Sequence, residues 1–301
     1  MNRNVMGFDG FTWFQGVVED HNDPEQIGRV KVRCVGIHTE DKETLPTDDL
    51  PWAMVMMPTT SASVSQIGHS PSGLLKGSWV MGWFRDGNSC QEPVVMGSFP
   101  GYPMTRPNTS LGFCDPTGTH PIEIEEPDTS RLSRGDRNSK LLKKKNEHLA
   151  SGEHPAHKIA YSSDTWTTMS NPYNARYPFN RVNQTESGHV IELDDTPNGE
   201  RINIQHMSGS FIEMHPDGSI RILNEGTHEL LIEKDHNQHT KGNFNIYVSG
   251  TATIRAEGNI DMESTKDIRA KCVNFVVDAS SVIDLNGGSE IDADAPIINL
   301  N

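Results

Sequence analysis

The C-terminal part of the chain repeats a pattern of apolar and polar residues every eight positions. In residues 242–265, GNFNIYVSGTATIRAEGNIDMEST, apolar and polar residues alternate and a glycine returns at each eighth position. Because successive side chains of a strand point to opposite faces, each octad predicts one short strand with an apolar and a polar face. A glycine at the corner can adopt a positive φ or let another backbone approach closely. The grid glycines are Gly218, Gly226, Gly242, Gly250 and Gly258, while Lys234 and Lys266 occupy grid points without glycine.

The apolar positions of the octads form columns that predict the interior of a solenoid. After Cys272 the columns shift by one residue, so one seven-residue step replaces an octad. The predicted interior residues are Phe244, Ile246, Val248, Ile254, Ile260, Ile268, Phe275, Val277, Ile283, Leu285 and Ile291.

Two architectures satisfy this repeat: a single chain coiled with three octads per turn, or three chains that each supply one side of a triangular prism. Residues 218–301 hold about ten octads. In a single chain these give only about three and a half turns, with exposed ends and edges. In an intertwined trimer they give about ten layers, each about 4.7 Å high. We therefore predict that residues 176–301 form a triple-stranded β-helix in a homotrimer, with octads from about residue 218.

Strand-length runs also occur in the first hundred residues. Five apolar or alternating runs lie within residues 11–20, 28–37, 51–58, 77–86 and 92–101, and clusters of Asp, Asn, Pro and Gly separate them. Five short strands can close into an OB-fold barrel, although composition alone favours a sandwich nearly as strongly. We expect an OB-fold over residues 1–102, which makes the whole chain all-β.

Residues 103–175 are rich in proline, glycine and polar residues. Because such a segment buries too little apolar surface to fold alone, we expect a long irregular connector that can become ordered by lying on another structure. SKLLKKKNEHLA, residues 139–150, predicts a short helix. The basic run from Arg131 to Lys145 is expected to be a solvated face or to contact acidic neighbours in the assembly, with nucleic acid or a membrane surface as the alternative.

Composition limits the class of protein. Hydrophobic residues at 34 %, with 26 Gly and 18 Pro, are typical of a soluble chain rich in strands and turns. No apolar run could span a bilayer and no signal peptide is evident, so we expect synthesis in the cytosol. The net charge of −15 argues against nucleic-acid binding. Cys34, Cys90, Cys114 and Cys272 lie far apart, which indicates reduced thiols rather than a zinc site.

Candidate chemistry is sparse. In IEIEEPD, Glu123 and Glu125 could share a strand face, but a glycosidase needs two carboxylates fixed in a cleft, and this sequence predicts a solvated loop. The histidine pairs of HPAH and HNQH would point to opposite faces of an extended strand. DDTPNGER, residues 194–201, fits a turn better than a calcium site, and GHSPSG lacks the setting of a nucleophile elbow. We predict no catalytic residue, metal or cofactor.

Two parts of the chain resemble the central spike protein of T4-like contractile phage tails. DHNDPEQIGRVKVRCVGIHTED and GHSPSGLLKGSWVMGWFRDGNSCQEPVVMGSFPG resemble that family's N-terminal OB-fold domain. YPFNRVNQTESGHVIELDDTPNGERINIQHMSGSFIEMHPDGSIRI resembles the segment that enters its β-helix, and a relative of this segment occurs in the VgrG spikes of type VI secretion systems. The resemblance covers about three quarters of the chain.

The resemblance implies a homotrimer in the tail baseplate of the virion, assembled in the host cytoplasm. The OB-fold would dock onto a hub ring protein, and the β-helix would puncture the host outer membrane when the sheath contracts. T4-like spikes carry a lysozyme domain between these parts, for which the connector here is too short and too polar. A structural spike without enzymatic activity is therefore expected. The alternatives are a tail-associated wall hydrolase with a degenerate lytic site and a VgrG-type secretion spike.

The C-terminal sequence APIINLN predicts an apolar end of the prism. The chain has no HxH motif, the motif with which some related spikes bind iron at the trimer axis. Because an open apolar end would be an exposed patch, we expect a separate PAAR-like tip protein to cover it. Its expected contacts are Ile297, Ile298 and Leu300.

Overall fold

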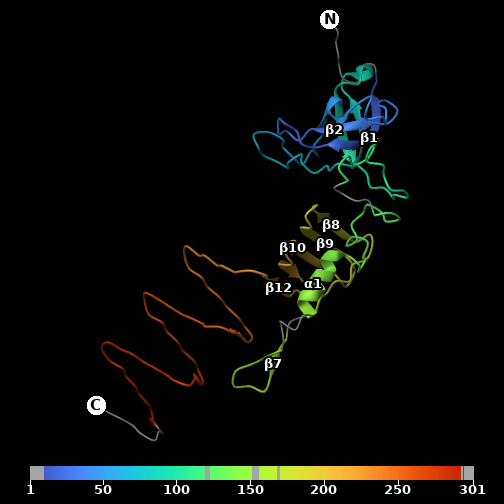
Figure 1. Ribbon diagram of the computed structural model, residues 1–301. Helices are drawn as coiled ribbons and strands as arrows, with labels where there is room; N and C mark the ends of the chain where they lie inside the picture. The colour runs from blue at the N-terminus through green and yellow to red at the C-terminus, as the bar shows by residue number, and fades with distance from the viewer. Residues whose placement is uncertain (1–9, 119–122, 151–155, 168–169, 293, 295–301) are drawn as a thin grey trace. The chain divides into compact units, whose positions relative to one another are not determined.

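A computed structural model of the 301-residue chain gives the fold (Figure 1). The structure describes residues 10–118, 123–150, 156–167, 170–292 and 294. Backbone contacts divide the chain into two units, Met1–Asn243 and Phe244–Asn301. Within the described ranges, α1 (Lys140–Ala150) is the single α-helix, and no helix combines the length and apolar character that a membrane crossing requires. The protein is therefore mostly β, with little helix.

Five strands of the N-terminal part close into a small barrel. In barrel order they are β1 (Thr12–Asp20), β2 (Val30–Cys34), β3 (Trp52–Val55), β5 (Pro93–Ser98) and β4 (Trp79–Phe84), with the 3-10 turns η1 (Thr47–Asp49) and η2 (Gly87–Ser89) in the loops. β4 pairs back onto β1, and β3 and β5 pair in parallel. This closure of five short strands is that of an OB-fold. The predicted OB-fold is confirmed, and the sandwich alternative is wrong.

The apolar sides of these alternating strands fill the barrel. Phe14, Val80 and Phe84 are buried there, and the ring centroids of the two phenylalanines lie 4.9 Å apart. Gly82 lets β4 approach β5 closely, because a Cβ at this position would lie 1.9 Å from the carbonyl oxygen of Val94. The barrel thus buries its apolar residues within a single chain.

A buried ion pair fixes the segment that follows the barrel. Arg33 and Glu19 are fully buried, and Arg33 Nε donates to Glu19 Oε1 at 2.7 Å. Arg33 also donates to the carbonyl oxygens of Thr39 and Leu45, at 2.7 and 2.8 Å. The backbone N–H of Phe113 donates to Glu19 Oε1 at 3.2 Å. Because these hydrogen bonds satisfy both buried charges, the pair holds residue 113 and the loop after β2 on the barrel.

A second sheet lies further along the chain. It is an antiparallel meander of β8 (Asn180–Gln184), β9 (Val190–Asp194), β10 (Arg201–Gln205), β11 (Phe211–Met214) and β12 (Ile220–Leu223), with β8 and β12 at its edges. Helix α1 covers one face of it, and Leu142 of the helix packs with Leu132, Tyr173 and Val190 (Figure 1). A separate hairpin pairs β6 (His157–Lys158) with β7 (Thr165–Trp166). Part of residues 103–175 is therefore ordered by packing on this sheet.

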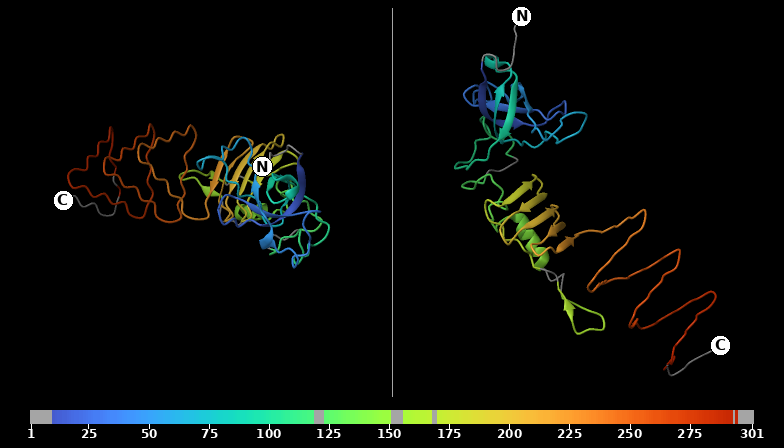
Figure 2. Two further views of the ribbon diagram at one scale, coloured as in Figure 1. Left: turned by 90° about the horizontal axis from the view of Figure 1, so that it is seen from above. Right: turned by 180° about the vertical axis from the view of Figure 1, so that it is seen from behind.

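Residues 224–292, all of which the structure describes, contain no strand and no buried residue. Figure 2 shows the end of this segment running back and forth in long turns. Bends fall at residues 225–226, 233–234, 241–242, 249–250, 257–258, 265–266, 273, 280–281 and 288–289. Their spacing is that of the sequence repeat, with a shorter step between residues 266 and 273.

The grid glycines differ in conformation. Gly218 has a φ of +84°, so the expected positive φ is found there. Gly226, Gly242, Gly250 and Gly258 lie outside the left-handed region, and no heavy atom of the chain lies within 4 Å of the position that a Cβ would take. Of the two expected alternatives, the positive φ is therefore not found at these four, and a close approach by another backbone stays a prediction for them.

Candidate functional site

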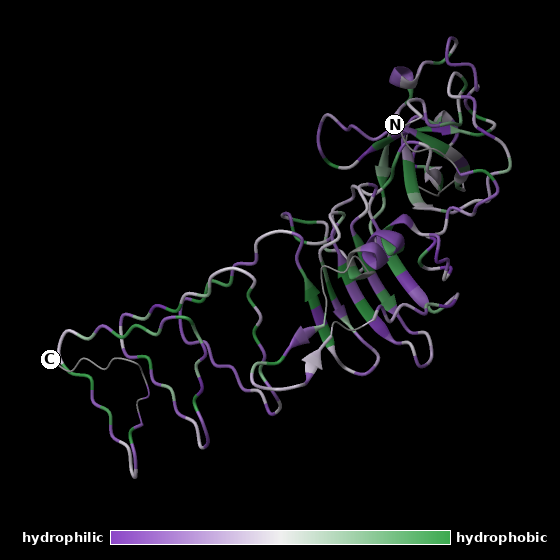
Figure 3. Ribbon diagram, turned by 60° about the horizontal axis from the view of Figure 1, so that its bottom comes forward, coloured by the Kyte–Doolittle hydropathy of each residue, from purple (hydrophilic) through white to green (hydrophobic). Residues whose placement is uncertain are grey.

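The sheet of β8 to β12 carries polar side chains on its covered face and apolar side chains on its uncovered face. On β10, Arg201 and Asn203 are buried while Ile202 and Ile204 are 42 % and 51 % exposed. β9, β11 and β12 alternate in the same sense, although Val190 and Phe211 add apolar side chains to the covered face, and Figure 3 shows the alternation. We call the apolar side the open face; it consists of Ile191, Leu193, Ile202, Ile204, Ile212, Met214, Ile220 and Ile222. A sheet with one covered face normally turns its apolar side inward, so the exposure of the apolar side departs from the usual arrangement.

The open face is continuous across four strands. Pairing places Ile191 opposite Ile204, and Ile204 opposite Ile212. Ile212 in turn lies opposite Ile222 on β12. Ile222 occupies the fourth position after its grid glycine, as Ile246 does in a later octad. In the sequence grid, Ile222 of the open face therefore falls in the same apolar column as Ile246.

The predicted interior residues of the octads are all exposed in the single chain. Their exposed fractions run from 46 % for Val248 to 83 % for Ile254. Their backbone belongs to no strand or bridge between residues 224 and 292. A lone chain would leave both its apolar side chains and its peptide groups in water, which is an unstable arrangement. The predicted tip contacts Ile297, Ile298 and Leu300 lie outside the described residues.

The covered face of the sheet holds a buried charge cluster. Arg201 Nη1 donates to Glu213 Oε1 at 3.0 Å, and Arg201 also pairs with Glu192. Lys145 of α1 pairs with Glu213 and donates to Asn203 Oδ1 at 3.3 Å. Burial lowers the pKa of Lys145 to about 8, although Glu213 acts in the opposite direction. Burial alone would raise the pKa of Glu213, but Lys145 and Arg201 outweigh it and the pKa is lowered.

The basic run is divided by this packing. Lys145 is buried with Glu213, so the expectation of a solvated face is wrong at this residue. Arg131 and Arg134 both pair with Glu126, at 2.6 and 2.8 Å. The run therefore contacts acidic residues of its own chain, which sequence reasoning placed in the wider assembly.

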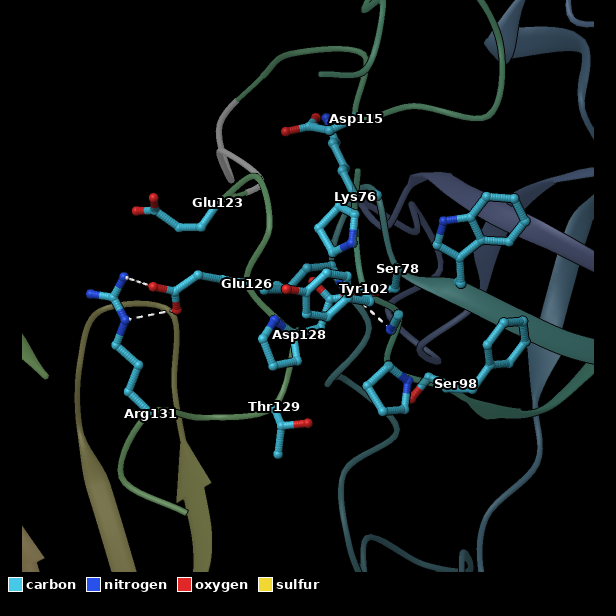
Figure 4. Close-up of a pocket in the computed structure, with 18 of the residues that line it drawn as sticks. Lys76, Ser78, Ser98, Tyr102, Asp115, Glu123, Glu126, Asp128, Thr129 and Arg131 are labelled. Atoms are coloured by element: carbon cyan, nitrogen blue, oxygen red, sulfur yellow. Dashed lines mark hydrogen bonds and ion pairs between the residues drawn. The ribbon is translucent and has the colours of Figure 1, made fainter. Parts of the chain in front are cut away.

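The carboxylates of IEIEEPD lie beside a cavity of about 920 Å³, lined also by Trp79 and Tyr102 (Figure 4). Arg131 and Arg134 lower the pKa of Glu126 to about 2. Glu123 lines the cavity too, whereas Glu125 lies in a turn with a φ of +63°. The expectation that Glu123 and Glu125 share a strand face is therefore wrong. A carboxylate with a lowered pKa is a poor general acid, so Glu126 is unsuited to the acid role in glycoside hydrolysis.

The DDTPNGER segment and His157 of HPAH lie in a turn and in a strand pairing, respectively. DDTPNGER forms the turn between β9 and β10, in which Gly199 N–H donates to Thr196 O at 2.8 Å and Asn198 has a φ of +61°. The rings of His157 and Trp166 lie with their centroids 5.0 Å apart and their planes tilted by 45°. Among the described residues, no group of three or more His, Cys, Asp or Glu side chains is arranged to hold a metal ion.

Comparison with known proteins agrees with this architecture. The family model of the Gp5 N-terminal OB domain matches residues 36–202. The chain is 37 % identical over 287 residues to Protein Gp5 of Vibrio phage KVP40, covering 86 % of this chain and 68 % of that protein. It is 40 % identical over 132 residues to the pre-baseplate central spike protein Gp5 of Enterobacteria phage T4, covering 42 % of this chain and 23 % of that protein. With its barrel and its repeats, the chain belongs to the Gp5 family of phage baseplate central spike proteins.

Proposed function

We propose that three copies of this chain form the central spike of a contractile tail baseplate. In this trimer the three open faces pack around a common axis, and the octads of the three copies intertwine into a triple-stranded β-helix. The observation that carries the proposal is the open face, because a folded sheet presents eight large apolar residues to water.

Burial of the open face supplies the driving force for this assembly. Covering one half-exposed aliphatic side chain contributes about 1 kcal/mol. The whole open face then contributes on the order of 8 kcal/mol per copy before the entropy cost of association. The interior residues of the octads add to this along the length of the spike.

The backbone of the octads leads to the same assembly. Unpaired peptide groups in residues 224–292 require hydrogen-bond partners from outside the chain. In an intertwined trimer the neighbouring copies provide these partners on both sides of each octad. Such a rod has no free strand edges along its length, which makes it stiff and resistant to unfolding.

The trimer acts as a structural part of the virion tail. Its OB-fold barrels dock to the hub ring protein of the baseplate, and its β-helix punctures the host outer membrane when the sheath contracts. A PAAR-like tip protein covers its C-terminal end. The spike is not an enzyme, since its task is to remain folded under load while the sheath supplies the energy.

The mass of the purified full chain in solution tests the proposal. We expect three times 33.4 kDa for the natural chain and loss of the trimer in Ile246→Glu, which places three carboxylates at the axis. Asn245→Glu is the matched control, because residue 245 lies on the opposite face of the same octad. A monomeric natural chain, or equal behaviour of the two variants, would contradict the proposal.

A further inference from the structure

Arg221 on β12 is a buried cation without a partner in the described part of its own chain. Its residue is 8 % exposed, and neither Nη1 nor Nη2 makes a hydrogen bond. Burial lowers the pKa of its guanidinium. A buried charge in this condition is destabilising until a counter-charge reaches it.

The carboxylate opposite Arg221 is shared by two other cations. Glu213 lies directly opposite Arg221 in the pairing of β11 with β12. Glu213 Oε1 accepts hydrogen bonds from Lys145 and Arg201, while its Oε2 lies 3.2 Å from His215 Nε2 and makes no hydrogen bond. Glu213 raises the pKa of Arg221, but burial outweighs it and no hydrogen bond joins the two side chains, so a second carboxylate would satisfy the guanidinium.

The free edge of β12 is the place from which that carboxylate can come. β12 is an edge strand of its sheet, so its outer backbone groups have no strand beside them. The chain itself adds none, because residues 224–292 contain no strand. A strand from another copy that pairs with this edge would place a side chain next to Arg221 on the polar face.

The geometry of the proposed trimer, on which this inference rests, determines which residue of the other copy lies next to Arg221. In an intertwined prism, a chain passes to the next side of the prism with each octad. On any one side, an octad of one copy therefore lies next to the following octad of the neighbouring copy. Parallel stacking in register brings residue i of one copy beside residue i+8 of the next, about 4.8 Å away. The residue eight positions after Arg221 is Glu229, which is exposed in the single chain.

Elsewhere in the repeat, charged residues that lie eight positions apart are more often opposite than equal in sign. On the polar faces of residues 218–292, opposite charges lie eight residues apart in five pairs: Arg221 and Glu229, Glu233 and Lys241, Arg255 and Glu263, Asp261 and Arg269, Glu263 and Lys271. Like charges lie eight apart in two pairs, Glu225 with Glu233 and Asp284 with Asp292. Since like charges placed side by side on neighbouring strands are destabilising, the excess of opposite pairs favours this register.

We propose that ion pairs between residues eight apart hold the three copies in register, and that Arg221 of one copy binds Glu229 of the next as the buried member of the set. A slip by one octad would place Asn237 beside the buried guanidinium and leave it without a carboxylate, so the pair opposes that slip. The exposed pairs along the prism contribute less, as solvated ion pairs do.

Cross-linking of the full chain tests the register. In Arg221→Cys with Glu229→Cys, the two thiols belong to different copies at a separation that a disulfide can span. Oxidation should then yield covalently linked copies on a denaturing gel. The natural chain with its four cysteines and the variant Arg221→Cys with Asn237→Cys are the controls, and neither should link. A trimer in which the first variant stays unlinked would overturn the register and leave the proposed function standing, whereas a monomer would overturn both.

Charge exchange tests the energetic part. Arg221→Glu and Glu229→Arg should each speed dissociation of the trimer at least about tenfold, and the double exchange should restore the rate to within about threefold. Arg221→Glu with Glu225→Arg has the same charges at a different spacing and should not recover. Additive effects in the first double variant, or equal recovery in the second, would overturn the proposal.

Discussion

The barrel and the octad repeat treat their apolar residues in opposite ways. Phe14 in the barrel is 5 % exposed, whereas Phe244 in the repeat is 62 % exposed. The barrel closes its own edges by pairing β4 with β1, while residues 224–292 of the repeat, all of them described, form no strand. The difference teaches that the barrel is a complete fold within one chain, whereas this part of the repeat is not.

The same substitution in both regions gives the largest expected effects. Phe244→Ala removes three rings from one layer of the trimer, at about 3 kcal/mol each, so the trimer should dissociate at much lower denaturant concentration. Phe14→Ala should cost the barrel about 3 to 5 kcal/mol and leave the mass of the trimer unchanged. Urea unfolding monitored by tryptophan fluorescence, with mass measured in parallel, checks both. If Phe244→Ala lowered the stability of the barrel alone, the comparison would fail.

The buried pair of the barrel is the next most sensitive point. Glu19→Ala leaves Arg33 buried with no carboxylate, which should lower the free energy of unfolding of the barrel by about 3 to 5 kcal/mol. The joint variant Glu19→Leu with Arg33→Met removes both charges and should recover a large part of that loss. Chemical denaturation of the three proteins measures the difference. Equal stability of the single and joint variants would show that the charge pair is not the cause.

The charge cluster of the second sheet should make stability depend on pH. The pKa of Lys145 is about 8 in the fold against an ordinary value of 10.5, so the unfolded chain binds more protons between these values. Stability should therefore rise as the pH increases from about 8 to 10.5, by up to about 3 kcal/mol. Denaturation across this range, with Lys145→Met as the control that lacks the group, checks the sign. A fall in stability that Lys145→Met abolishes would contradict it.

An exposed ion pair on the barrel should have the smallest effect. Arg85 and Glu92 lie 3.7 Å apart, and both side chains are half exposed or more. Arg85→Ala should change the free energy of unfolding by less than about 0.5 kcal/mol, because water screens the pair. A thermal melt measured beside that of Glu19→Ala is sufficient. A comparable loss in both variants would mean that burial does not separate the two pairs.

The sequence predicted the strands of the barrel because their alternation matches a half-buried strand and their turn residues are clear. It also located the octads. It did not reveal which side of β9 to β12 is covered, because alternation defines two faces without saying which one packs. Lys145 was missed for a related reason: its neighbours Lys143 and Lys144 look solvated, and only its spacing from Leu141 and Leu142 places it on the packed side of α1.

The path of the connector explains the remaining misses. Arg131 and Arg134 lie five and eight residues after Glu126, but no regular pattern brings them to its carboxylate, and nothing local indicates that Glu19 reaches the backbone of Phe113, 94 residues away. Such contacts depend on where the connector meets the folded parts, and the connector has no periodic pattern from which its path could be read.

The short step between residues 266 and 273 has a consequence for the accuracy of assembly. In the proposed trimer, one side of the prism would lose about 3.3 Å at this level, and all three sides would have to lose it in the same layer for the cross-section to remain an equilateral triangle. A copy displaced by one octad would place its short segment beside two longer ones and strain two layers. The short step would therefore act together with the proposed Arg221–Glu229 pair against a displaced copy.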